Sequence, residues 1–365
     1  MYALLGATFL VALLICVDSV PWIIRIARRR NFLDHPGPGK IHTTARPYGG
    51  GIAVALGMLL TLGCGIAAAL LQDQRGWFDH LDFATHAAGV IAKAPTLAIY
   101  AAGSVAMLLL GLVDDRRSVS PRGKLLLQSM IAVATVLSGE RLSLFWEGTL
   151  AGDCVGIAVT VLWIVGVTNA MNLLDHMDGL ASGTGLLVSL AFAMVAWQTG
   201  QLFLAGALAA LAGACAGFLF FNFPPSKIFL GDAGSYFIGY WLAVLTVSFT
   251  FYESGRPWYA YAVPFVVLAV PLFDVVRVVF IRIRHRRSVF RGDRNHFAHR
   301  LTDLGLSPRT AVLSIHALTA VTGLAAILLY QVNETGAAIV LAQLLLVFAV
   351  ITLLEISGRK NVSSD

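Results

Sequence analysis

Residues 154–183 read CVGIAVTVLWIVGVTNAMNLLDHMDGLASG, and this stretch decides the fold of the chain. Its first part, up to residue 174, is an apolar run of about 20 residues, the length that crosses a bilayer as an α-helix. The run ends in Asn169, Asn172, Asp175 and Asp178, three residues apart. Carboxylates at a membrane boundary are costly unless paired, and on a helical end these positions share one face. The stretch predicts a membrane helix ending in a binding site; an ordinary capped helix end is the alternative.

The rest of the chain repeats this apolar pattern. Of its 365 residues, 58% are hydrophobic and 13% are charged, whereas soluble chains carry about 25% charged residues. The composition predicts an all-α, polytopic integral membrane protein, with residues 1–365 forming a single membrane domain. About eleven transmembrane helices are expected, over residues 2–24, 49–71, 94–113, 124–139, 154–174, 181–197, 202–222, 233–251, 258–281, 310–330 and 336–355.

The distribution of Lys and Arg predicts the orientation of these spans. If the N-terminus is extracytoplasmic, 22 of the 26 Lys and Arg residues face the cytoplasm, and only Arg75, Lys93, Arg141 and Arg256 face outward. Cytoplasmic loops of membrane proteins carry such an excess. We therefore expect an extracytoplasmic N-terminus and a cytoplasmic C-terminus. Catalytic cytoplasmic loops are then expected over residues 25–48, 114–123, 172–181, 223–233 and 282–309.

Clusters of acidic residues fall at the predicted cytoplasmic ends of three spans. Asp114 and Asp115 end the third span, Asp175 and Asp178 end the fifth, and Asp232 follows the seventh. Carboxylate oxygens are hard ligands that suit Mg²⁺, with Mn²⁺ as a second choice, and such an ion binds phosphates. The sequence GxxxxGK[ST] is absent, which disfavours an ATP-driven motor. The pattern favours Mg²⁺-dependent phosphoryl transfer at the inner membrane face.

Five runs together resemble one family. They are DHPGPGKIHTTARPYGGG (34–51), GLVDDRRSVSPRGKLLLQ (111–128), NAMNLLDHMDGLASG (169–183), NFPPSKIFLGDAGSYFIG (222–239) and RGDRNHFAHRL (291–301). In this order they resemble the polyprenyl-phosphate N-acetylhexosamine-1-phosphate transferases. Relatives in this family are the undecaprenyl-phosphate GlcNAc-1-phosphate transferases and the phospho-MurNAc-pentapeptide translocases. Eleven spans with an outside N-terminus also fit the family.

The resemblance implies roles for individual residues in catalysis. Asp232 matches the aspartate that binds Mg²⁺, and Asn172 the asparagine beside the metal and pyrophosphate. Asp114 matches the aspartate proposed to deprotonate the lipid phosphate, and Asp115 its essential neighbour. Asp175 is expected to shape the loop or to assist catalysis.

The resemblance also implies a substrate-binding set. Asn222 and Phe229 match positions that hold uracil, Phe229 by stacking, and Asp178 matches a residue near the nucleoside. The basic and histidine positions expected to bind substrate are Lys40, His42, Arg294, His296 and His299.

Three positions depart from the family pattern. His176 stands where the family often has the first Gly of Asp-Gly-Φ-Asp-Gly (Φ, apolar), and Tyr48 where many relatives have Arg. Ala298 interrupts a loop that often reads His-Ile-His-His in the GlcNAc branch. These departures leave the expected metal and pyrophosphate chemistry intact and bear on the choice of sugar.

The resemblance implies transfer of an N-acetylhexosamine 1-phosphate from a UDP-sugar, foremost UDP-GlcNAc, to undecaprenyl phosphate, with release of UMP. The expected partners are the lipid, the UDP-sugar and the membrane, without nucleic acid, and a homodimer is compatible with the family. The expected location is the bacterial cytoplasmic membrane, with the active site on its cytoplasmic face. One-step and covalent two-step routes both stay open.

Two alternatives come with this interpretation. Within the family, the chain could be a UDP-MurNAc-pentapeptide translocase, although that branch usually has a triple-histidine loop. From another class, it could be a secondary transporter, which would predict acidic residues near mid-span and inverted repeats. The acidic residues at span ends favour the enzyme.

Overall fold

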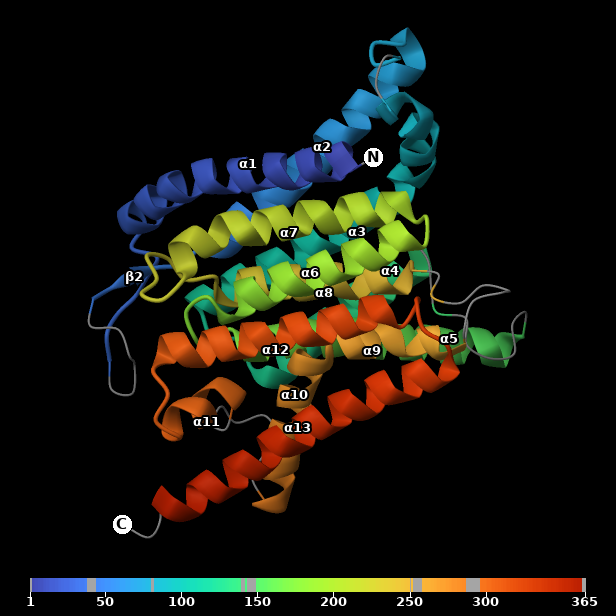
Figure 1. Cartoon of the computed structure of the whole chain (residues 1–365). Helices are drawn as coiled ribbons and strands as arrows, with labels where there is room; N and C mark the ends of the chain where they lie inside the picture. The colour runs from blue at the N-terminus through green and yellow to red at the C-terminus, as the bar shows by residue number, and fades with distance from the viewer. Residues whose placement is uncertain are drawn as a thin grey trace. The chain divides into compact units, whose positions relative to one another are not determined.

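The computed structural model describes residues 2–37, 44–79, 82–138, 142, 149–249, 251, 258–286 and 296–362 (Figure 1). These residues are mostly helical, and their only strand pairing joins β1 (Leu33–Asp34) to β2 (Arg46–Pro47) in antiparallel register. The chain divides into two compact units, Met1–Phe249 and Thr250–Asp365. The all-α polytopic class is confirmed, and a single membrane domain stays a prediction.

The described part of the first unit contains eight α-helices. A 3₁₀ turn over Asp82–His86 precedes the third of them. The helices are α1 (Tyr2–Arg29), α2 (Gly50–Arg75), α3 (Ala87–Arg116), α4 (Pro121–Ser138), α5 (Leu150–Leu174), α6 (Leu180–Gln198), α7 (Leu202–Asn222) and α8 (Gly231–Val247).

Helix α8 is the core of the first unit. Every residue of α8 except Asp232 is buried, and the helix packs against α2, α3 and α5. Glycines permit these close approaches, because a Cβ at Gly51 would collide with Gly234 and one at Gly111 would collide with Ala233. Small residues at helix contacts are the usual device for close packing in membranes. The start of α8 is therefore held between the ends of two neighbouring helices.

Eight described helices are long and apolar enough to cross a membrane, and a bent pair would make nine. The eight are α1, α2, α3 with its preceding turn, α5, α6, α7, α12 (Pro308–Leu328) and α13 (Glu334–Val362). The other two expected spans, 124–139 and 233–251, match α4 and α8. Helix α4 carries Arg122 and Lys124 in its first turn, and α8 has only 17 residues. The number eleven and the orientation stay predictions.

The expected span 258–281 is bent in the structure. The segment Trp258–Val267, which ends in α9 (Val263–Val267), meets α10 (Ala269–Arg284) at 70°. Pro271 explains the break, because it has no N–H to donate to the carbonyl of Val267 and so cannot continue the helix across Leu268. The expected span is therefore present as a pair of helices with a bend between them.

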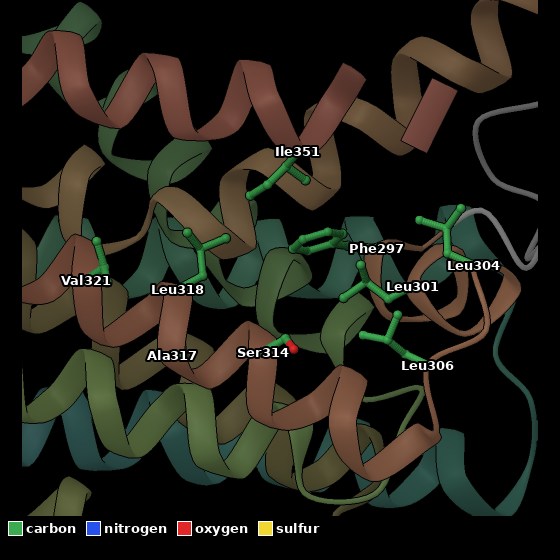
Figure 2. A pocket seen from close by; sticks show the side chains of 9 residues that line it. All are labelled: Phe297, Leu301, Leu304, Leu306, Ser314, Ala317, Leu318, Val321 and Ile351. Atoms are coloured by element: carbon green, nitrogen blue, oxygen red, sulfur yellow. The ribbon is translucent and has the colours of Figure 1, made fainter. Parts of the chain in front are cut away.

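The second unit also contains α11 (Phe297–Asp303), α12 and α13. Side chains from these three helices, with Leu304 and Leu306 between α11 and α12, line an open apolar pocket of about 450 Å³ (Figure 2). Its lining includes Phe297 and Leu301 of α11, Leu318 of α12 and Ile351 of α13, and Ser314 is its one polar side chain. A cavity of this composition offers no ligand for a diphosphate, so the candidate site lies elsewhere.

Candidate active site

The candidate site is built around Asp232, in the first turn of α8. Asn172, near the end of α5, donates from Nδ2 to Asp232 Oδ1 over 2.7 Å and to Ser235 Oγ over 3.0 Å. The Asp232 side chain keeps 29% of its surface exposed, although the rest of α8 is buried. The carboxylate of Asp232 is thus the part of the core helix that a ligand can reach.

Asp114 and Lys124 complete one side of this site. Lys124, in the first turn of α4, forms ion pairs with Asp114 Oδ2 and with Asp232 Oδ2, the latter over 3.2 Å. Asp114 is buried and also accepts hydrogen bonds from Val119 N at 2.9 Å and Tyr236 Oη at 3.3 Å. One ammonium therefore bridges two carboxylates from helices far apart in the sequence.

Asp115 binds the backbone of α8. Its Oδ1 accepts from Asp232 N at 2.8 Å, and its Oδ2 accepts from Ala233 N at 3.3 Å. The first N–H groups of a helix have no partner within that helix, and a carboxylate from outside can satisfy them. Asp115 thus caps α8 and fixes the backbone of Asp232, whose carboxylate is exposed, and of Ala233.

The glycine before Asp232 makes this approach possible. Gly231 has a φ of +75°, a left-handed conformation in which residues with a Cβ are strained. A Cβ added there would also lie 2.5 Å from Asp115 Oδ2. Gly231 is therefore required both by its backbone conformation and by the capping carboxylate.

Asp175 lies directly after α5 and faces the same cluster. Burial of its carboxyl raises its pKa well above the ordinary range, and the charges of Asp232 and Asp115 raise it further. A hydrogen bond with the backbone of Gly231 opposes this shift. The repulsion among these acidic groups is the electrostatic condition that a bound cation would relieve.

Asn222 and Asp178 connect the loops beside the cluster. Asn222 Oδ1 accepts from Gly179 N at 3.0 Å and from Ser182 Oγ at 2.9 Å, and its Nδ2 donates to Ile228 O at 3.0 Å. Asp178 Oδ2 accepts from Ser226 N at 2.9 Å. Both expected nucleoside-binding residues thus join the 175–180 loop to the segment that leads into α8.

Phe229 belongs to the same segment. Its N–H donates to Pro47 O at 2.9 Å and its carbonyl accepts from Gly50 N at 3.0 Å. Its ring meets that of Tyr48 edge-on, with centroids 6.0 Å apart. Phe229 is the expected uracil-stacking residue, and Tyr48 is one of the departures from the family pattern. Their rings therefore lie against each other.

The structure separates the four polar positions of the opening stretch. Asn172 and Asp175 reach the cluster and Asp178 joins the neighbouring loops. Asn169 instead donates to Gln128 Oε1 at 2.6 Å and ties α5 to α4. Of the four positions expected to share one face, Asn169 is therefore directed toward α4 and not toward the cluster around Asp232.

His176 does not adopt a positive φ, the backbone conformation that would favour glycine at this position. Positive φ among non-glycine residues is recorded only at Asn31 and Arg286 in the described part of the chain. His176 Nδ1 instead lies 2.7 Å from Leu173 O. The departure from Gly at this position is thus accommodated by the end of α5.

Lys40, His42 and Arg294 fall outside the described residues. His296 and His299 belong to the second unit, where His296 is buried against Asp274.

Lys124 is the site residue that sequence reasoning missed. A usable signal was its place in the first turn of a helix that starts at Pro121. A cation there opposes the helix dipole, so another interaction must favour it. Asp114, ten residues earlier, and Asp232 supply that interaction.

The donor set fits a divalent cation in its chemistry. Within the described residues, no three Asp, Glu, His or Cys side chains are already arranged to hold a metal. The ammonium of Lys124 occupies the position between Asp114 and Asp232 where a positive charge is favoured. Carboxylate and amide oxygens are suitable Mg²⁺ ligands, so the residues present fit a divalent cation that would take the place of the Lys124 ammonium.

Comparison with known proteins gives the same assignment. Residues 97–250 match the model of glycosyl transferase family 4. A Bacillus subtilis protein named "Probable undecaprenyl-phosphate N-acetylglucosaminyl 1-phosphate transferase" is 30% identical, over 97% of this chain and 92% of its own length. The decaprenyl-phosphate N-acetylglucosaminephosphotransferase of Mycobacterium tuberculosis is 31% identical, over 98% and 89%. A phospho-N-acetylmuramoyl-pentapeptide-transferase of Desulforamulus reducens is 29% identical, over 64% and 69%.

The fold and the site thus define a multi-pass membrane transferase. The chain belongs to the polyprenyl-phosphate N-acetylhexosamine-1-phosphate transferases, within glycosyl transferase family 4. It is an enzyme of the glycosyl-1-phosphate transferase class, which confirms the resemblance found in its motifs. The reported relatives are transferases and give no support to the transporter alternative.

Proposed function

We propose that this enzyme transfers N-acetylglucosamine 1-phosphate from UDP-N-acetylglucosamine to undecaprenyl phosphate, releases UMP and so starts a lipid-linked glycan. The observation that carries the proposal is the gathering of Asp114, Asp115, Asn172 and Asp175 around Asp232. Relatives named for N-acetylglucosamine align over 75% to 98% of the chain, whereas two named for the MurNAc-pentapeptide align over 64% and 38% of it. This difference supports the N-acetylglucosamine branch.

The proposed location is the bacterial cytoplasmic membrane, with eleven spans and the N-terminus outside. The excess of Lys and Arg in the loops that join the acidic helix ends supports a site on the cytoplasmic face. UDP-sugars would then reach the cluster from the cytoplasm, and the lipid phosphate would enter from the bilayer.

Asp232 and Asn172 would hold the proposed Mg²⁺, or Mn²⁺ in its place, with the Asn172 amide oxygen turned toward the ion. When bound, such an ion supplies neutralisation of charge on the diphosphate. Lys124 would then be released from Asp232 and remain beside Asp114, where its ammonium can bind a phosphate oxygen. The chain's own residues thus provide the charge complement for two phosphorylated substrates.

The proposed reaction is an in-line displacement at the sugar-linked phosphorus. An oxygen of the lipid phosphate forms the new bond, the bond to the UMP oxygen breaks, and UMP leaves with that electron pair. Asp114 takes the proton of a singly ionised lipid phosphate, or orients the phosphate when it is already ionised. Because a carboxylate is a weak base, positioning and charge neutralisation contribute most of the acceleration.

Purified enzyme in detergent tests this proposal. It is given Mg²⁺, undecaprenyl phosphate and, in separate reactions, UDP-N-acetylglucosamine, UDP-N-acetylgalactosamine or UDP-MurNAc-pentapeptide, and UMP release is measured. We expect release with UDP-N-acetylglucosamine that depends on both lipid and metal. Release only with the pentapeptide substrate would assign the other branch, and no release with any UDP-sugar would overturn the proposal.

Asp232→Asn tests the metal assignment. The variant keeps the side-chain volume and the acceptor for Asn172 but removes the charge. We expect a folded protein without measurable UMP release, whereas Asp73→Asn, an exposed carboxylate at the far end of α2, should retain activity. Normal turnover by Asp232→Asn would contradict the assignment.

An exchange experiment separates the two routes. Labelled UMP is incubated with UDP-N-acetylglucosamine and enzyme in the absence of lipid. A covalent two-step route would move label into UDP-N-acetylglucosamine, and a one-step route would not.

A further inference from the structure

A buried carboxylate in the second unit binds two successive residues at the start of α11. Asp274, on α10, is completely buried. Its Oδ2 lies 3.0 Å from His296 Nδ1, and its Oδ1 accepts from Phe297 N at 2.6 Å. Nη1 of the buried Arg300 lies 3.9 Å from the same Oδ1. These contacts offset the cost of burying the carboxylate.

Asp274 supplies the cap that α11 lacks. His296 occupies the N-cap position, but its side chain makes no capping hydrogen bond. The N–H of Phe297 therefore needs an acceptor from elsewhere, and Asp274 provides it from α10. The neighbouring residue Phe273 packs edge-on against Phe297, with ring centroids 5.8 Å apart. Two successive residues of α10 thus hold two successive residues at the start of α11.

The same carboxylate selects the tautomer of His296. An ionised carboxylate only accepts hydrogen bonds, so the proton of a neutral His296 ring must be on Nδ1. Nε2 is then an acceptor in the neutral ring and a donor in the charged ring. Partners that fix one ring nitrogen in this way determine what the other can bind.

We propose that Asp274 is the positioning residue of His296: it fixes the Nδ1–H tautomer and the ring orientation through which His296 acts on the sugar nucleotide. The inference rests on the proposed function, because it assumes that His296 takes part in binding UDP-N-acetylglucosamine. Asp274 itself touches no substrate. Its effect on turnover passes entirely through the imidazole.

Asp274→Asn tests the inference. An asparagine can still accept from Phe297 N, but its amide group is then a donor toward His296 and forces the proton to Nε2. We expect KM for UDP-N-acetylglucosamine to rise by about 10- to 100-fold, by analogy with the loss seen when the partner of a metal-binding histidine is removed, with a smaller change in kcat. His296→Ala should give a similar rise, and the double variant should be no worse than His296→Ala alone.

The combination of variants separates positioning from general support of the fold. If Asp274 acts only on stability, its effect and that of His296→Ala will multiply, since they are then independent. That result would overturn the inference. Asp303→Asn removes an exposed carboxylate at the other end of α11 and is the matched control, with unchanged KM expected.

A spectroscopic measurement requires neither turnover nor a folded variant of Asp274. In full-length wild-type enzyme labelled with ¹⁵N-histidine, the neutral ring of His296 should carry its proton on Nδ1 and have an unprotonated Nε2. The His296 signals are assigned as those missing from His296→Ala. A neutral His296 ring with its proton on Nε2 in the wild type would overturn the inference. Absence of UMP release by the wild type would instead overturn the proposed function and leave this measurement valid.

Discussion

The Nζ of Lys124 lies 3.2 Å from Oδ2 of Asp232, and the same ammonium is paired with Asp114. A single side chain from the start of α4 thus neutralises carboxylates from the end of α3 and the start of α8. The side chains of Lys124 and Asp232 are 26% and 29% exposed, so an incoming ligand can reach both partners. This bridge holds the cluster together and leaves it open to exchange one cation for another.

Lys124→Gln should lower kcat/KM for UDP-N-acetylglucosamine by about 10- to 100-fold. Loss of the ammonium removes hydrogen bonds to charged groups, each contributing about 1.5–3 kcal/mol, and leaves Asp114 and Asp232 to repel each other. Arg122→Gln is the matched control, because Arg122 is exposed in the same helical turn. Steady-state UMP release at saturating Mg²⁺ measures the effect. Equal activity in Lys124→Gln and Arg122→Gln would contradict a role for the bridge.

Asp115→Ala should reduce both stability and turnover, because it leaves the N–H groups of Asp232 and Ala233 without their acceptor. Loss of a helix cap costs about 1 kcal/mol. Asp115→Asn retains one acceptor oxygen and should recover much of the stability. Thermal unfolding in detergent, followed beside UMP release, separates the two quantities. If Asp115→Asn is fully stable but inactive, the carboxylate has a chemical role beyond capping.

Much of the membrane architecture could be predicted from the sequence, because apolar length alone identifies most spans. The bend at Leu268 could not, since Pro271 is compatible either with the start of a helix or with a kink inside one. The sequence also identifies helix α8 only as another membrane span. That it lies buried among α2, α3 and α5 depends on glycine contacts between segments far apart in the chain.

The candidate site was partly predictable for a similar reason. The acidic residues stand at helix ends that are all predicted to lie on the cytoplasmic side of the membrane. The topology alone therefore predicts that they lie close together. Which of them faces Asp232 depends on rotation of each helix, and this turned Asn169 toward Gln128 while Asn172 reached Asp232. Asp114, one partner of Lys124, is only ten residues away in the chain, but its other partner, Asp232, is 108 residues away. Asp274 and His296 are 22 residues apart, and no local pattern encodes either of these longer contacts.

Gly231→Ala should be destabilising by more than the strain of its backbone alone. A left-handed conformation costs a residue with a Cβ about 1–2 kcal/mol. Gly200 has the same φ of +75° but no atom near its Cβ position, so Gly200→Ala measures that strain by itself. The excess loss in Gly231→Ala reports the collision with Asp115 Oδ2. Chemical or thermal unfolding of both variants checks this, and equal losses would show that Asp115 moves aside freely.

The pH dependence of stability should reveal Asp175. Burial and the charges of Asp232 and Asp115 raise its pKa in the folded protein. A group with a raised pKa in the folded state stabilises it most below the unfolded pKa, about 3.9 for Asp, and this stabilisation is lost as the pH rises through the folded pKa. The wild type should therefore lose more stability than Asp175→Asn between pH 4 and neutrality. Unfolding temperatures measured in Mg²⁺-free detergent across this range test the sign. Parallel curves for the two proteins would mean that Asp175 titrates normally, whereas added Mg²⁺ should bring the curves together by offsetting the repulsion among the carboxylates.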